Sequence, residues 1–135
     1  MDIINLAREL GAAIQQNEEY IDYKIKEQNV ECDEALQKII EEFNLKKVSI
    51  NNEIGKENVD QEKIDELNNS IGELYNEIMH NENMKSYNES KQKFEEILGK
   101  VSFIINSASQ GQDPYSIDAE VETSCGGNCS GCSGC

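Results

Sequence analysis

The chain has 135 residues, the size of a single domain, with only one proline and nine glycines. Twelve basic residues against 27 acidic ones give a formal net charge of −15 at pH 7. A chain this acidic is repelled by phosphate backbones and by anionic membrane surfaces, so we expect neither direct nucleic-acid binding nor membrane binding. There is no apolar run of the roughly 20 residues that span a bilayer and no secretory signal at the N-terminus, so we expect a cytoplasmic protein.

From residue 2 to about 108 the apolar residues recur at helical spacing, without competing strand-like alternation. The first predicted helix carries apolar residues at alternating steps of four and three, namely Ile3, Ala7, Leu10 and Ile14. Tyr20, Tyr23 and Ile25 indicate a short second helix. Asp33 is the predicted N-cap of a third helix, which runs from Leu36 to a stop near Gly55.

Asp60 is the predicted N-cap of a fourth helix, and Asn81 opens a fifth. The fourth helix has an unbroken heptad stripe made of Ile64, Leu67, Ile71, Leu74 and Ile78. The fifth repeats the three-four step through Met84, Tyr87, Phe94, Leu98, Val101, Ile105 and Ala108. We predict an all-α fold, an elongated antiparallel helical hairpin or bundle of about five helices. Because a hairpin leaves part of its stripe exposed, we expect the fourth and fifth helices to bury apolar surface against another chain.

The composition changes after Ala108. Ser109-Gln-Gly-Gln-Asp-Pro114 contains a helix stop followed by a proline, and residues 111–135 hold four acidic residues and no lysine or arginine. We therefore divide the chain into a helical domain (1–110) and an acidic, Gly/Cys-rich, metal-binding tail (111–135). Without a metal or partner, we expect this tail to be disordered, because it has too few apolar residues to offset the entropy of ordering.

Four of the five cysteines lie in the last eleven residues, at Cys125, Cys129, Cys132 and Cys135. Their C-x3-C-x2-C-x2-C spacing, with only Gly, Ser and Asn between the thiols, suits four soft ligands that converge on one metal centre. The short gaps favour a 4Fe-4S cluster. Zinc is the main alternative, although zinc sites usually place two ligand pairs a dozen or more residues apart. A copper–thiolate site and a tail that binds no metal remain alternative interpretations.

Other candidate sites are weaker. Glu77-Ile-Met-His80 has the Glu-x-x-His spacing of di-iron bundles, but the chain has one histidine and such sites need two motifs, so we expect a surface histidine at a helix end. Cys32 lies between Glu31 and Asp33, whose carboxylates oppose thiolate formation, so we expect a buried or half-buried structural thiol. No catalytic residue is predicted, and we do not expect an enzyme.

The body resembles the YlbF/YmcA family of small helical bacterial regulators. The resemblance rests on Leu10-Gly11-Ala-Ala-Ile14, Ala35-Leu36-Gln-Lys-Ile39-Ile40-Glu-Glu-Phe43, Ile78-Met79-His80-Asn81 and Phe94-Glu-Glu-Ile97-Leu98-Gly-Lys-Val101. It covers about residues 2–108. Where the family usually has Asn-Pro before its last helix, this chain has Asn81-Glu82.

The resemblance implies an all-α protein that forms homo-oligomers, or hetero-oligomers with a related YmcA/YlbF-like protein. It also implies a complex with a YaaT-like protein that carries 4Fe-4S clusters and acts with ribonuclease Y in RNA processing, with effects on competence, sporulation and biofilm formation. The cysteine tail is similar to C-termini in part of the family. We therefore expect a non-enzymatic regulator or adaptor. The alternatives are a carrier or storage protein for iron or zinc and an oligomeric helical scaffold.

Overall fold

The computed structural model describes residues 1–118, and these residues form five α-helices and no strand. The helices are α1 (Ile3–Gln16), α2 (Glu18–Cys32), α3 (Glu34–Ile54), α4 (Gln61–His80) and α5 (Glu82–Ser109). The predicted all-α fold of about five helices is confirmed. The second helix is longer than expected, at 15 residues, because Asn17 caps it and its acidic first turn, Glu18 and Glu19, suits the positive end of the helix dipole.

The starts of α3, α4 and α5 lie where the sequence predicts them, because each is set by a local side-chain hydrogen bond. The side chain of Asp33 accepts a hydrogen bond from the backbone N–H of Leu36, at 3.0 Å. Asp60 accepts from the N–H of Lys63, and Asn81 from the N–H of Met84. An N-cap of this kind satisfies one backbone donor that the first helical turn leaves free.

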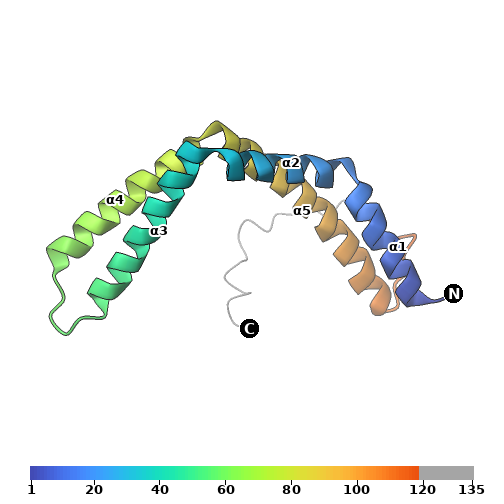
Figure 1. Cartoon of the computed structure of the whole chain (residues 1–135). Helices are drawn as coiled ribbons and strands as arrows, with labels where there is room; N and C mark the ends of the chain where they lie inside the picture. Colours follow the sequence, from blue (N-terminus) through green and yellow to red (C-terminus); the bar gives the residue numbers. More distant parts are fainter. Residues whose placement is uncertain (119–135) are drawn as a thin grey trace. The chain divides into compact units, whose positions relative to one another are not determined.

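The chain divides into two compact units, residues 1–90 and residues from 91 onward. In the first unit, α3 and α4 form an antiparallel hairpin whose helices lie side by side and are joined by residues 55–60 (Figure 1). Leu36 is fully buried, and the α4 residues Ile64, Leu74 and Ile78 are buried with it as the core of this unit. Three of the five apolar residues of the α4 stripe are therefore covered inside the chain, whereas Leu67 and Ile71 are half-buried.

The buried part of this stripe contacts α3 within the chain. The expectation that the fourth and fifth helices bury apolar surface against another chain stays a prediction. A sequence pattern shows that a stripe needs a partner and does not say which helix provides it.

In the second unit, α5 ends in a Schellman motif. Gly111 has a φ of 89°, the left-handed conformation that glycine adopts at little cost. The N–H of Gln112 donates to the carbonyl of Ser107, and the N–H of Gly111 donates to that of Ala108. Ile105, assigned to the apolar stripe of the last helix, is exposed. The division into a 1–110 domain and a 111–135 tail stays a prediction.

Candidate functional site

The predicted metal ligands Cys125, Cys129, Cys132 and Cys135 lie outside the described residues. Their assignment as cluster ligands stays a prediction, as does the expectation about the order of the tail. Among residues 1–118, no group of three or more His, Cys, Asp or Glu side chains is arranged to hold a metal ion.

Cys32 is exposed, which corrects the prediction of a buried or half-buried thiol. It is the last residue of α2 and precedes the cap residue Asp33. The sequence placed it at a helix boundary, but a boundary residue can face either way, and the packing of α2 decides its exposure. The thiol is thus accessible to reagents.

His80 is the exposed last residue of α4, as predicted. Its Nδ1 lies 2.7 Å from the carbonyl oxygen of Asn76, one helical turn earlier. Because a carbonyl oxygen can only accept a hydrogen bond, Nδ1 is the donor in this contact.

The best-organised polar site of the first unit lies where two helix junctions meet. One carboxylate oxygen of Asp33, Oδ1, accepts the capping hydrogen bond from Leu36. The other oxygen, Oδ2, accepts from the side-chain amides of Asn81, at 3.1 Å, and Asn83, at 3.0 Å. These three donors hold the pKa of the Asp33 carboxyl below its usual range, the backbone N–H of Leu36 having the largest effect. We call Asp33, Asn81 and Asn83 the junction cluster.

A pair of tyrosines also joins α2 to the first turns of α5. The rings of Tyr23 and Tyr87 stack with their centroids 5.7 Å apart and their planes 27° from parallel. The hydrogen bond with Tyr87 raises the pKa of Tyr23 well above its ordinary value, helped by burial and by Glu27. Lys24 lies over the Tyr23 ring at 5.2 Å. Stacked aromatic rings of this kind stabilise a contact beyond the area they bury.

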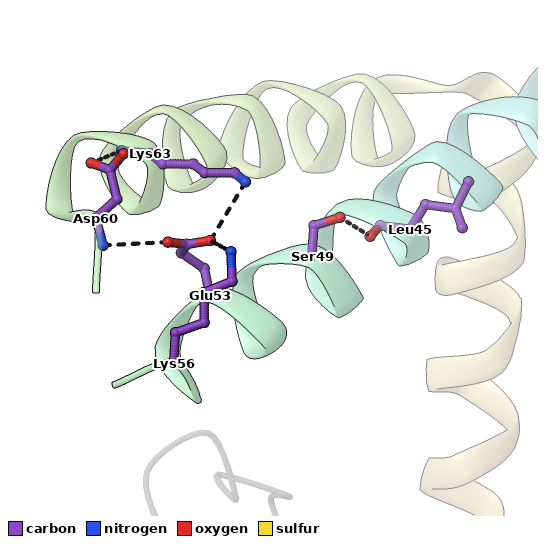
Figure 2. A network of polar contacts seen from close by, with 6 residues as sticks. All are labelled: Leu45, Ser49, Glu53, Lys56, Asp60 and Lys63. Carbon is purple, nitrogen blue, oxygen red and sulfur yellow. Dashed lines mark hydrogen bonds and ion pairs between the residues drawn. The ribbon is translucent and has the colours of Figure 1, made fainter. Parts of the chain in front are cut away.

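Glu53 is the carboxylate that the sequence reasoning missed. Its side chain is only 4% exposed although it lies on the last turn of α3. Lys56 binds its Oε2 at 2.8 Å and Lys63 reaches the same oxygen at 3.5 Å, while Oε1 accepts from the backbone N–H of Asp60 at 3.3 Å (Figure 2). These contacts lower the pKa of the Glu53 carboxyl, Lys56 most strongly, against the opposing effect of burial.

Figure 2 shows that this cluster closes the loop between α3 and α4, since Glu53 comes from α3, Lys63 from α4, and Lys56 and Asp60 from the loop. One signal was available in the sequence: Glu53 and Lys56 are three residues apart, the spacing of a helical ion pair. Burial of the carboxylate depends on the return of α4 over it. The arrangement ties the last turn of α3 to the first turn of α4 and to the loop between them.

A surface groove follows one face of α3. Its lining residues are Gln37, Lys38, Ile40, Glu41, Asn44, Leu45 and Val48. Leu45 and Val48 are exposed to solvent. A surface this open suits contact with another protein better than enclosure of a small ligand, which requires a deep cleft.

The family model described as "Control of competence regulator ComK, YlbF/YmcA" matches residues 3–108, well over half of the chain. The chain belongs to the YlbF/YmcA family. All five helices of this family member fall within the matched range, apart from the final residue of α5. No curated protein and no solved structure matched the chain significantly.

The YlbF/YmcA family is associated with control of a competence regulator, which supports a regulatory role acting through proteins. Among the described residues, no helix is long and apolar enough to cross a membrane. The family match ends at residue 108, so it does not extend to the four tail cysteines of this member.

Proposed function

We propose that this member of the YlbF/YmcA family is a non-enzymatic cytoplasmic regulator or adaptor that works through protein partners and binds an iron–sulfur cluster. The observation that carries the regulatory part is the family match over residues 3–108. The four closely spaced cysteines of the tail support the proposal that the chain binds an iron–sulfur cluster.

The donor chemistry fits a 4Fe-4S cluster. Each of the four cysteines would supply one thiolate, and the spacers between them contain only Gly, Ser and Asn, which do not compete as ligands. Glycine spacers also let the backbone turn tightly enough for neighbouring thiolates to face one centre. Zinc, the alternative metal, would use the same four thiolates in a tetrahedral site.

The proposed partners are a related YmcA/YlbF-like protein and a YaaT-like protein, with ribonuclease Y as the enzyme whose action on RNA the complex influences. Competence, sporulation and biofilm formation are the proposed outputs. With a net charge of −15, the chain should not bind RNA itself, because it repels the phosphate backbone. Its effect on RNA should pass through the partner enzyme.

Anaerobic reconstitution with iron and sulfide tests the cluster. The loaded full chain should show a broad absorption band near ~400 nm, as thiolate-bound clusters do. Cys129→Ser or Cys132→Ser should abolish the band, whereas the matched control Cys32→Ser should keep it. Equal metal binding by the quadruple serine variant at positions 125, 129, 132 and 135 would refute the tail site. Tight zinc binding without the band would assign the site to zinc.

Two further measurements separate regulation from metal delivery and from a plain scaffold. Co-purification with ribonuclease Y, sensitive to loss of the tail cysteines, supports the regulator. Rapid transfer of iron or zinc to an apo acceptor protein, without any stable partner, indicates a carrier. Salt-sensitive RNA binding by the isolated chain would contradict the charge argument.

A further inference from the structure

The junction cluster joins the caps of two helices whose starts are far apart in sequence. At α3, the backbone N–H of Leu36 donates to Oδ1 of Asp33, at 3.0 Å. At α5, the N–H of Met84 donates to Oδ1 of Asn81, also at 3.0 Å. The side-chain amide of Asn81 donates in turn to Oδ2 of Asp33, at 3.1 Å. A continuous chain of hydrogen bonds therefore runs from the first turn of α3 to the first turn of α5.

Both capping side chains serve the two helices at once. Asn81 caps α5 with its oxygen and reaches Asp33 with its nitrogen. Asp33 caps α3 with one oxygen and accepts from Asn81 and Asn83 with the other. If either capping side chain rotates away, hydrogen bonds are lost at both helix starts. Linked hydrogen bonds of this kind also strengthen one another, so their energies are not independent.

The burial of the cluster suits local opening. Asp33, Asn81 and Asn83 are each half-buried, so water can replace their hydrogen bonds when the cluster opens. Opening of this kind costs less free energy than unfolding of a whole domain. Behind the cap of α3 lies Leu36, which is fully buried. The cluster therefore stands between solvent and the core of the first unit.

A second contact limits how far such an opening extends. Residues 82–90 of α5 belong to the first unit, together with α2 and α3. Within them, the ring of Tyr87 stacks on Tyr23 of α2, with the centroids 5.7 Å apart. This stacking uses none of the capping groups, so it holds α5 to α2 when the caps are broken. Opening should therefore stop before Tyr87.

We propose that the first turns of α3 and α5 open and close as one unit, with the junction cluster as the tie between them. A change at either junction is thereby transmitted to the other across about 50 residues of sequence. The coupling is a conformational device of the helical body. It is independent of the metal cluster proposed for the tail.

Amide hydrogen exchange followed by NMR on the purified full chain tests the coupling. The amides of Leu36 and Met84 are direct reporters, because each donates to a capping side chain of the cluster. In the wild type the two amides should exchange with the same opening free energy and the same response to low denaturant. The amide of Lys63 is the internal reference, since it is capped by Asp60 on α4.

Two variants should remove the tie and keep each cap. Asp33→Asn retains a carbonyl oxygen for the cap of α3 but loses the second acceptor. It should speed exchange of Met84 by about 10-fold, the value of a hydrogen bond to a charged acceptor. Asn81→Ser retains a hydroxyl that caps α5 but loses the amide donor. It should speed exchange of Leu36 by a similar factor.

Asp60→Asn is the matched control, because it makes the same substitution in a cap outside the junction cluster. It should leave the exchange of Leu36 and Met84 unchanged. The coupling would be wrong if each cluster variant affected only the helix that carries it. If a variant unfolded the chain, Lys63 would exchange faster as well, and the wild-type comparison would decide: unequal opening free energies for Leu36 and Met84 would overturn the proposal.

Discussion

Oδ2 of Asp33 accepts a hydrogen bond of 3.0 Å from the side-chain amide of Asn83, across 50 residues of sequence. The same carboxylate caps α3 through Oδ1. One side chain thus fixes the start of α3 and holds it to the start of α5, while Asn81, which also donates to Asp33, caps that helix. The Asp33 carboxylate is therefore a shared acceptor that links the α2–α3 junction to the α4–α5 junction.

Replacing Asp33 by alanine should lower the melting temperature by about 3–8 °C, the order expected for loss of a helix cap, with a further drop from the two unpaired amides. Asp33→Asn should cost less, because asparagine can still cap the helix through its carbonyl oxygen. Thermal unfolding followed by circular dichroism measures both variants. Equal melting temperatures for wild type and Asp33→Ala would show that the junction cluster does not support the fold.

The buried carboxylate Glu53 should make stability depend on pH. The pKa of the Glu53 carboxyl is lowered in the folded chain. Its contribution to the free energy of unfolding is therefore fully present above the pKa that glutamate has in the unfolded chain, about 4.3. The contribution is lost as the pH falls through the folded-state value. Denaturant unfolding at a series of pH values should therefore show a shallower acid loss for Glu53→Gln than for the wild type.

Glu57→Gln is the matched control for that series, since Glu57 is an exposed residue of the same loop. It should follow the wild-type pH profile. If the two glutamine variants gave the same profile, the ion pairs with Lys56 and Lys63 would have no measurable part in stability.

The hydroxyl of Tyr23 should titrate above the ordinary pKa of tyrosine. Its pKa is raised by the hydrogen bond with Tyr87 and by burial, so the folded state holds the phenolic proton above the ordinary pKa of about 10. The corresponding stability is complete below that value and is lost as the pH rises through the raised one. Ultraviolet titration of tyrosinate should show this late step in the wild type and not in Tyr23→Phe. Tyr115→Phe, at an exposed position, should retain it.

The core of the hairpin predicts a graded set of stability losses. Leu36→Ala and Leu74→Ala should each cost about 2–5 kcal/mol of unfolding free energy, because both side chains are buried. Leu98→Ala should cost less, since Leu98 is half-buried. Leu45→Ala, at an exposed position, should change it by less than about 0.5 kcal/mol. Urea denaturation measures all four variants. A large loss of unfolding free energy for Leu45→Ala would show that the core is assigned to the wrong residues.

The sequence by itself determined that the chain is helical and where α3, α4 and α5 begin, because caps and apolar periodicity act over three or four residues. Asp33, Asp60 and Asn81 were readable as caps for that reason, and so was the glycine stop at Gly111. The spacing of the tail cysteines was equally local, and it remains the basis of the cluster hypothesis.

Only the tertiary structure decided which surfaces of the helices are buried and which are exposed. The contact of α3 with the stripe of α4 depends on the path of the loop between the two helices. The same return of α4 buries Glu53 and brings Lys63 to it. The packing of α2 leaves Cys32 exposed, and the meeting of two distant junctions gives Asp33 its amide donors. Each of these outcomes depends on residues far apart in sequence, whose contacts exist only once the helices have packed.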